Sequence, residues 1–163
     1  MLNKILDLYL HVFHKSFDYD QIDEYVFIGT NMCCQYGFDK ELLGKNVRAD
    51  ISLEETKVDA PTGVGYFLWL STKDHEAPSP EQLALGVLTL DFLIKKKVRI
   101  FIHCTKGHGR APTLYAAYLV SKGMKVDEAL AQIKTKRPAI HLEGSQHEAL
   151  VEFAKHYPQK RNS

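Results

Sequence analysis

The sequence has little cysteine and no long apolar run, and both absences narrow the class of protein. Three cysteines among 163 residues are too few for a disulfide framework, and an odd number leaves at least one thiol unpaired. This count favours a reducing compartment, so we expect a cytoplasmic protein. Because apolar residues never continue for about 18 positions, the sequence also predicts no transmembrane segment.

An excess of charge of one sign is missing as well. The chain carries 21 Lys and Arg residues against 20 Asp and Glu residues, a formal net charge of +1. Proteins that bind nucleic acid in general usually show a clear basic excess, so we expect no nucleic-acid partner. The length, the 45% hydrophobic content and the lack of repeats or linkers predict one domain over residues 1–163, acting as a monomer.

Residues 1–20 are predicted to form an amphipathic helix. Apolar side chains recur there at helical spacing, at Leu2, Ile5, Leu6, Tyr9, Leu10 and Phe13. Asp7, His11 and Lys15 interrupt the apolar character and no small-residue cleavage site follows, which argues against a signal peptide. We expect this helix to dock on the domain, with attachment to a membrane surface as the alternative.

Four later segments have the pattern of β-strands. Residues 25–28 and 98–102 are short apolar runs, while residues 47–53 alternate between apolar and polar side chains. That alternation predicts one buried and one wet face. Residues 66–70 are apolar throughout, which predicts a buried strand. Its aromatic side chains are therefore expected in the core: Tyr66, Phe67 and Trp69.

Helical patterns separate and follow these strands. Ser79, Pro80 and Gln82 form an N-terminal capping signature ahead of apolar residues at helical spacing. The C-terminal third carries only helical patterns, and its last helix is predicted to begin at Ser145 with Glu148 closing a capping box. Strands that alternate with helices indicate an α/β fold: a single domain with a central, mostly parallel sheet flanked by helices and a helical C-terminal part.

One segment carries the residue types that chemistry needs. A predicted strand runs through His103 into Cys104, and Arg110 follows after five further residues, among them Gly107 and Gly109. A short loop between a strand and a helix can turn its backbone N–H groups inward as an anion nest, and the helix N-terminus adds partial positive charge. The planar guanidinium of Arg110 can bind two phosphate oxygens at once. The segment therefore predicts a phosphate site with a cysteine at its base.

A cysteine in such a positive site predicts nucleophilic phosphoryl transfer. Surroundings of this kind hold a thiol as the thiolate near neutral pH, so we expect Cys104 to attack a phosphorus atom. Water then releases the resulting thiophosphate. The leaving oxygen needs a proton from a general acid on another loop at the same edge of the sheet. The loop after residues 66–70 offers Asp74, which we favour, and Glu76 as the alternative.

The motif His103-Cys104-x5-Arg110, with the upstream acid loop of residues 73–78, resembles the cysteine-dependent protein tyrosine phosphatases. The size of the chain and its compact acid loop resemble the dual-specificity branch of that superfamily. The resemblance covers residues 22–157, which it marks as the catalytic core. It implies a phosphatase in which Cys104 is the nucleophile, Asp74 the general acid and Arg110 the phosphate-binding arginine.

The resemblance also implies a set of supporting residues. It implies a phosphate-binding loop made of Thr105, Lys106, Gly107, His108 and Gly109 together with Arg110. His103 matches the histidine that orients and tunes the cysteine loop, and Gln146 stands where related chains often have a glutamine near the site. The family usually places Ser or Thr directly after the arginine, where its hydroxyl helps the thiolate leave, but this chain has Ala111. Hydrolysis of the thiophosphate is therefore expected to be slower or to be assisted differently.

The substrate stays open on sequence grounds. Lys106 and His108 make the loop more basic than the reaction requires, which fits a phosphoinositide, phospholipid or sugar phosphate and equally fits steering of any phosphate. We expect phosphotyrosine in proteins first, with phosphoserine and phosphothreonine as further substrates and the small phosphorylated molecules as the alternative. Ala111 alone supports a third interpretation, a protein that binds a phosphorylated partner without turnover.

The remaining cysteines and histidines point to no metal site. His141 and His147 lack a zinc-ligand spacing and no cysteine pair accompanies them, so we expect neither a metal nor another cofactor. Cys33 and Cys34 are expected to pack in the core, because a free cysteine behaves as a small apolar residue. A protective disulfide between one of them and Cys104 is the alternative.

Overall fold

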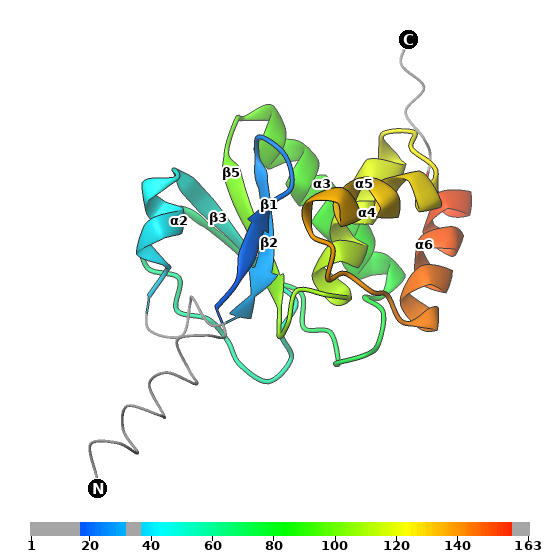
Figure 1. Ribbon diagram of the computed structural model, residues 1–163, viewed down its shortest axis with the longest axis horizontal. Coiled ribbons are helices and arrows are strands. Elements are labelled where there is room, and N and C mark those ends of the chain that lie inside the picture. The colour runs from blue at the N-terminus through cyan, green and yellow to red at the C-terminus, as the bar shows by residue number, and fades with distance from the viewer. Residues whose placement is uncertain (1–16, 32–36, 158–163) are drawn as a thin grey trace, which may run out of the picture.

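The computed structural model describes residues 17–31 and 37–157, which form a five-stranded sheet with helices packed against it (Figure 1). The strand order across the sheet is β1-β2-β5-β3-β4. The strands β2, β5, β3 and β4 run parallel, and β1 pairs antiparallel with β2. Their bounds are β1 Tyr19–Gln21, β2 Val26–Thr30, β3 Val47–Ser52, β4 Tyr66–Trp69 and β5 Arg99–Cys104. The predicted α/β class with a mostly parallel sheet is confirmed.

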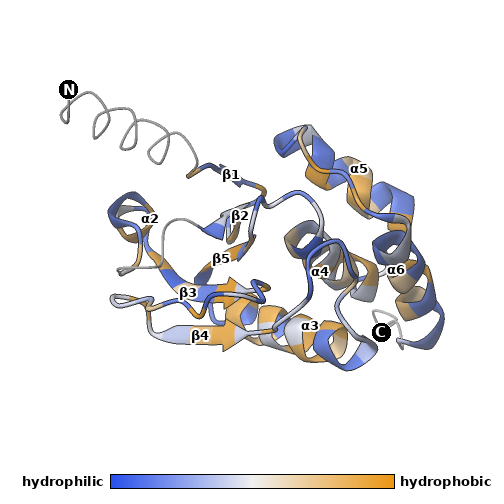
Figure 2. Ribbon diagram, turned by 90° about the horizontal axis from the view of Figure 1, so that it is seen from below, coloured by the Kyte–Doolittle hydropathy of each residue, from blue (hydrophilic) through white to orange (hydrophobic). Residues whose placement is uncertain are grey.

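Helices cover the two faces of the sheet unequally. On one face α3 and α4 pack against the strands, and Figure 2 shows α4 between the sheet and the pair formed by α5 and α6. The short α2 lies on the opposite side of the sheet (Figure 1). The helices are α2 Lys40–Gly44, α3 Pro80–Lys95, α4 Arg110–Ser121, α5 Val126–Lys136 and α6 Gly144–His156.

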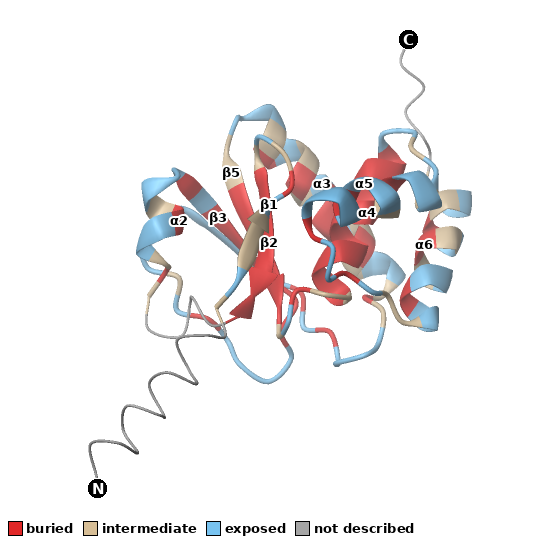
Figure 3. Ribbon diagram, viewed as in Figure 1, coloured by how far each residue is buried: buried red, intermediate tan, exposed pale blue. Residues whose placement is uncertain are grey.

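The larger hydrophobic core lies between the sheet and the helices α3 and α4, and every residue of α4 is buried (Figure 3). A Cβ on Gly86 of α3 would lie 2.4 Å from Cδ1 of Leu114, so the close approach of the two helices requires glycine there. A second, smaller cluster covers the other face: Phe27, Phe38, Leu42, Val47 and Phe101. Burial on both faces fixes the carboxyl ends of β5 and β3, where the candidate site lies.

Two strand predictions are wrong in detail. β4 lies at the edge of the sheet, and the side chains of Tyr66, Phe67 and Trp69 are exposed instead of lying in the core. An apolar run does not reveal strand order, because pairing with distant segments decides it. In β3, Asp50 and Ser52 are buried, since the second cluster covers the face that the alternation predicted to be wet.

The predicted helix over residues 1–20 is wrong at its C-terminal end. Tyr19–Gln21 form β1 and pair with β2, because the helical spacing of apolar residues does not continue into this segment. Residues 1–16 lie outside the described residues, and so do Cys33 and Cys34.

Capping explains where the best-defined helices begin. The predicted capping box of Ser79 and Gln82 is confirmed at the start of α3. The box at α6 joins Glu143 and Gln146, two residues before the predicted Ser145 and Glu148, and the helix begins at Gly144. In the described ranges, no helix combines the length and the apolar character that crossing a membrane needs.

Candidate active site

The loop between β5 and α4 joins two buried elements at the carboxyl edge of the sheet. β5 ends at Cys104, which is buried, and α4 begins at Arg110. Gly107 has a φ of +66°, and a Cβ there would lie 2.5 Å from a backbone oxygen of β2. A Cβ on Gly109 would lie 2.6 Å from Oε1 of Gln146. Position 107 therefore requires glycine, whereas a Cβ at position 109 would displace the Gln146 side chain.

A cavity of about 330 Å³ opens over this loop and gathers residues from distant parts of the chain. Cys104, Arg110 and Asp74 all line it, so the three predicted reacting groups share one space. The other lining residues are Lys106, His108 and Gly109 of the loop, and His75, His141, Glu143 and Gln146. Of the remaining predicted residues, Thr105 and Gly107 are not among those that line it.

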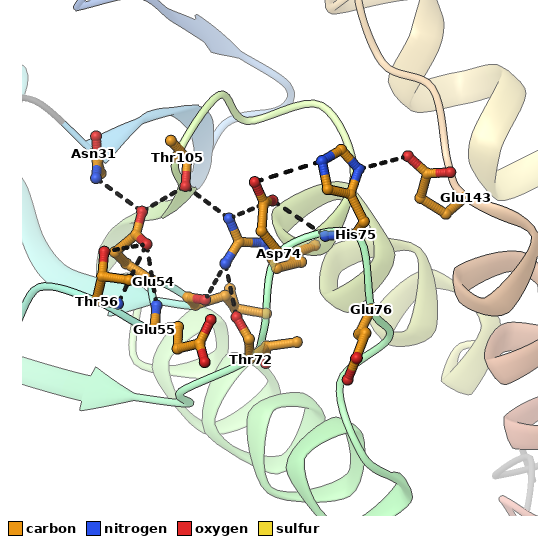
Figure 4. A network of polar contacts seen from close by, with 12 residues as sticks. Asn31, Glu54, Glu55, Thr56, Thr72, Asp74, His75, Glu76, Thr105 and Glu143 are labelled. Carbon is orange, nitrogen blue, oxygen red and sulfur yellow. Dashed lines mark hydrogen bonds and ion pairs between the residues drawn. The ribbon is translucent and has the colours of Figure 1, made fainter.

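The guanidinium of Arg110 is buried and held on several sides. Its Nη1 donates to the carbonyl oxygens of Thr72 at 2.7 Å and Leu53 at 3.2 Å. Its Nη2 donates to Oγ1 of Thr105 at 2.7 Å and lies 2.8 Å from Oδ1 of Asp74 (Figure 4). These contacts fix the guanidinium plane, which bidentate binding of a phosphate requires.

Glu54, directly beyond β3, is a site residue that the sequence did not predict. Its buried carboxylate accepts hydrogen bonds from Oγ1 of Thr105 at 2.6 Å and from Nδ2 of Asn31 at 2.8 Å (Figure 4). Burial alone would raise the pKa of the Glu54 carboxyl, but the Thr105 hydrogen bond and the charge of Arg110 outweigh burial and lower that pKa. Glu54 is therefore an anionic anchor that holds Arg110 through the Thr105 hydroxyl.

The loop after β4 presents Asp74 to the cavity and turns Glu76 away from it (Figure 4). The Glu76 carboxylate instead binds Lys73 at 2.8 Å. His75 has a φ of 64°, and its Nδ1 lies 2.8 Å from Oε1 of Glu143, the N-cap of α6. The geometry thus favours Asp74 over Glu76 for any role in the cavity.

Gln146 ties the same loop to α6. Its side chain is buried, and its Nε2 donates to the carbonyl oxygen of Glu76 at 3.0 Å. Its Oε1 accepts from the backbone N–H of Glu143 at 3.0 Å. The residue that the resemblance placed near the site therefore lies at the cavity, where it holds the loop that carries Asp74 against the start of α6.

His103 lies beneath the loop and does not line the cavity. It is fully buried and stacks on Phe101, with ring centroids 5.1 Å apart. Its Nε2 lies 2.9 Å from Oδ2 of Asp59 and 3.2 Å from Oδ1 of Asp50. Ligand atoms of these three residues lie within 4.8 Å of one another, a spacing that a metal ion could also use. The contacts of the imidazole with both carboxylates and its stacking on Phe101 fix the ring orientation beside Cys104.

A second buried arginine supports the loop from behind. Arg137, at the end of α5, donates from Nε to the carbonyl oxygen of Gly107 at 3.0 Å and from Nη2 to that of Lys106 at 3.2 Å. Its Nη1 lies 2.7 Å from Oδ2 of Asp20 and 3.1 Å from Oδ2 of Asp18. These contacts direct two loop carbonyl groups toward Arg137 and so favour a nest of N–H groups on the other side. No local signal in the sequence marks Arg137.

His108 and His141 meet at the rim of the cavity. Their ring centroids are 5.2 Å apart, and the backbone N–H of His141 donates to the carbonyl oxygen of His108 at 3.0 Å. Burial, and then the charge of Arg137, lower the pKa of His108, so its imidazole is neutral at pH 7. The sequence placed only His108 at the site, because the contact with His141 depends on the path of the chain after α5.

Ala111 leaves the start of α4 without a hydroxyl next to Arg110. The neighbouring Thr113 donates its hydroxyl proton to the carbonyl oxygen of Gly109 at 2.8 Å. Thr105 donates its hydroxyl proton to Glu54. Both hydroxyl protons are therefore engaged elsewhere, and neither is aimed at the thiol of Cys104.

The fold and the cavity have counterparts among known proteins. A family model described as "Polymorphic toxin system, DSP-PTPase phosphatase" matches residues 30–124, which is more than half of the chain. The chain belongs to this family, which falls in the dual-specificity branch of the cysteine-dependent tyrosine phosphatase superfamily.

Individual relatives have names that refer to two kinds of substrate. Phosphatidylglycerophosphate phosphatase PTPMT2 of Arabidopsis thaliana is 31% identical over 149 residues, which are 84% of this chain and 63% of that protein. Protein tyrosine phosphatase type IVA 2 of Mus musculus is 37% identical over 67 residues, 39% of this chain and 40% of that protein. The chain thus spans less than two thirds of the length of these curated relatives.

Solved structures match over a larger share of their length. The crystal structure of PTPMT1 superposes with a TM-score of 0.71 at 29% identity, covering 85% of this chain and 94% of that chain. Human DUSP28 superposes with a TM-score of 0.75 over 83% of this chain and 95% of its own, but at 14% identity it supports the fold alone.

Proposed function

We propose that the protein hydrolyses phosphate monoesters through a cysteinyl-phosphate intermediate. The observation that carries this proposal is the meeting of Cys104, Arg110 and Asp74 in one cavity at the carboxyl edge of the sheet. The guanidinium of Arg110 and the backbone N–H groups of the loop between β5 and α4 bind the phosphate. The N-terminus of α4 adds partial positive charge at the same place.

In the first step the Cys104 thiolate forms a bond to phosphorus while the bond from phosphorus to the leaving oxygen breaks. The electron pair of that bond stays on the leaving oxygen, which takes a proton from the Asp74 carboxyl. Arg110 stabilises the charge on the phosphoryl oxygens throughout. Substrate phosphate replaces Asp74 on the guanidinium, and this frees the carboxyl to hold the proton that it delivers.

In the second step a water molecule attacks the phosphorus of the thiophosphate. Its proton passes to the Asp74 carboxylate, the sulfur–phosphorus bond breaks, and Cys104 leaves as the thiolate. Ala111 offers no hydroxyl to the departing sulfur, and Thr105 and Thr113 have donated theirs elsewhere. We propose that this second step limits turnover on activated substrates.

As substrate we propose the phosphate monoester of a phospholipid headgroup. The similarity to the phosphatidylglycerophosphate phosphatase extends over 84% of the chain, and one related solved structure, 27% identical with a TM-score of 0.71, is titled as PTPMT1 in complex with PI(5)P. Lys106 brings a positive charge to the lining of the cavity, and His108 and His141 line it as well, so the cavity suits a headgroup with a second anionic group. This order reverses the one expected from the sequence, which placed phosphoproteins first.

Phosphotyrosine in proteins is the second candidate. It is supported by the family model, whose description names dual-specificity phosphatases, and by the match to a type IVA tyrosine phosphatase over 67 residues. That shorter match makes the candidate weaker, because the segments that shape the rest of the cavity lie beyond it.

A phosphate-release assay on three substrates tests the proposal. The substrates are phosphatidylglycerophosphate in detergent micelles, a phosphotyrosine peptide, and an activated aryl phosphate, with Cys104→Ser as the control variant. We expect release from all three, the highest kcat/KM for the phospholipid, and no release by Cys104→Ser, which should still bind vanadate. A higher kcat/KM for the peptide would assign protein substrates. Turnover by Cys104→Ser would overturn the mechanism, and no release by the wild type would leave a phosphate-binding protein.

A further inference from the structure

Exposed apolar side chains gather on β4 and α3, away from the cavity. Six of the seven large apolar residues that are exposed among the described residues lie on these two elements. They are Tyr66, Phe67, Trp69, Leu85, Leu88 and Phe92. A groove lined by β4 and by Leu88 and Phe92 of α3 joins the two elements on the α3 side of the sheet, and the two elements together are called the β4–α3 surface below. Tyr66 belongs to the α3 side, whereas Phe67 and Trp69 stand in register with Asp50 and Ser52 and belong to the other side of the same edge. Exposed apolar areas of this kind mark interaction sites in soluble proteins.

The strand in this surface is an unprotected sheet edge. Among the described residues β4 pairs only with β3, so the N–H and C=O groups of its other edge have no strand partner. Natural edge strands are usually blunted by charged side chains, proline or a bulge. The sequence of β4, Tyr66–Trp69, contains neither a charge nor a proline. Backbone groups and side chains of β4 therefore both favour addition of another strand.

The helix in this surface carries an uncharged stripe between two charged ends. Leu85, Leu88 and Phe92 follow one another at intervals of three and four residues, which places them on one side of α3. The exposed residue before this stripe is Glu81, and the exposed residues after it begin with Lys95. The exposed side of α3 is thus acidic before the apolar stripe and basic after it.

In place of the monomer expected from the sequence, we propose that a second copy of this chain covers the β4–α3 surface, with β4 pairing antiparallel to its own counterpart about a two-fold axis. Such an axis also makes the two α3 helices antiparallel. Glu81 of each copy then approaches the basic end of α3 in the other copy, and Leu88 lies near the axis. The charge pattern of α3 is therefore complementary to itself in this arrangement.

The dimensions of the paired elements agree with this arrangement. Adjacent strands lie about 4.8 Å apart and packed helices about 8–10 Å apart, so two helices fit side by side over a sheet that continues from one copy to the next. Figure 2 shows α3 beside β4 at the edge of the sheet, and the groove between them is lined by both. Pairing of the strands therefore brings the two apolar stripes together.

The exposed side chains supply most of the area that a stable dimer needs. The six exposed side chains keep between 41% and 59% of their surface in solvent. At roughly 200 Å² for a large side chain, they can bury about 600 Å² per copy. An interface of standard size buries about 800 Å² per partner, so these side chains account for roughly three quarters of that area.

Light scattering on the purified full chain tests the proposal through Leu88. The wild type should have twice the mass of one chain at about 100 µM, where an interface of standard size is fully formed. Leu88→Glu and Leu88→Lys should each be monomeric, because like charges meet at the axis. An equal mixture of the two variants should form dimers again, which a general loss of stability could not produce. Val58→Glu is the matched control, since Val58 is 60% exposed against 59% for Leu88 but lies outside the surface.

Three results would overturn the proposal. A wild type that is monomeric at about 100 µM would overturn it, because that concentration saturates an interface of this size. A dimer that survives both Leu88 variants would place the interface elsewhere. A wild-type monomer that binds vesicles or an extended peptide through β4 would assign the surface to a membrane or to another protein. Amide hydrogen exchange supplies an independent readout, since only the dimer should protect the N–H groups of β4.

Discussion

The Asp74 carboxylate lies 2.8 Å from Nη2 of Arg110, so the proposed general acid contacts the group that is proposed to bind phosphate. A phosphate dianion that enters the cavity competes with this carboxylate for the guanidinium. Arg110 keeps its hydrogen bonds to Thr105 and Thr72 at 2.7 Å when Asp74 leaves, so the guanidinium stays in place. Substrate binding and release of the acid are thereby coupled.

Asp74→Asn should reduce kcat on an alkyl phosphate monoester by about 10²–10⁴, because the leaving alkoxide no longer receives a proton. The loss on an activated aryl phosphate should be far smaller, since that leaving group needs little protonation. Steady-state kinetics on both substrates measures the difference. Glu76→Gln is the control and should leave both rates near the wild-type values, because Glu76 binds Lys73. Equal losses on the two substrates would remove Asp74 as the acid.

Thr105→Val should lower kcat/KM by about 10- to 100-fold. The change removes the hydroxyl that joins Glu54 to Arg110, and hydrogen bonds to charged groups contribute about 1.5–3 kcal/mol. Thr105→Ser should restore most of the activity, because it keeps the hydroxyl. Thr113→Val serves as the control, since it removes only a hydrogen bond to a carbonyl oxygen in the first turn of α4. An active Thr105→Val enzyme would show that Arg110 needs no such anchor.

Glu54→Gln should destabilise the protein in a pH-dependent manner. The native pKa of Glu54 lies below its ordinary value of 4.5, so the carboxylate contributes stability above that value. The contribution is lost as the pH falls through the lower native pKa. The difference in Tm between wild type and variant should therefore be largest near neutral pH and shrink in acid, which thermal unfolding between about pH 7 and pH 3 measures. A difference that does not change with pH would contradict the assignment.

Ala111→Ser should accelerate breakdown of the thiophosphate by about tenfold, through a hydrogen bond to the departing sulfur. Rapid mixing with an activated aryl phosphate should give a burst of product in the wild type and a smaller burst with a higher steady rate in the variant. Ala111 is fully buried, so circular dichroism must first show that the variant folds. A wild type without a burst would show that the second step is not the slow one.

Arg137→Met should cost about 1–3 kcal/mol of stability, because it leaves two loop carbonyl groups without their donor. Arg137→Lys should cost nearly as much, since lysine keeps the charge but not the fork that reaches four groups. Urea unfolding measures both changes, with Arg99→Met as the control for a partly exposed arginine whose side chain donates to one carbonyl group. A loss no larger than that of the control would mean that Arg137 does not hold the loop.

Features set by neighbours in the chain could be predicted from the sequence. Cys104 and Arg110 flank one short loop between a strand and a helix, so their shared site follows from local geometry. Asp74 could be placed because carboxyl ends of parallel strands meet at one edge of a sheet. The capping box of Ser79 and Gln82 is equally local, and it is confirmed.

Features set by pairing of distant segments could not be predicted. Glu54 reaches Thr105, and Arg137 reaches Asp20, only after the strands and helices have packed. Neither residue has a local pattern that separates it from a surface charge. The exposure of Trp69 at the sheet edge has the same cause, because strand order depends on long-range pairing and not on the apolar run itself.

The ion pair between Arg137 and Asp20 shows that the structural unit extends beyond the residues matched by the family model. The family match covers residues 30–124, and it includes every group that is proposed to react. Asp20 lies before that segment and Arg137 after it, yet their side chains meet at 2.7 Å behind the loop. A fragment trimmed to the matched residues would keep Cys104, Asp74 and Arg110 but would lose the contacts of Arg137 that support the loop. A minimal version of this chain with the proposed activity should therefore begin before Asp18 and extend beyond Gln146.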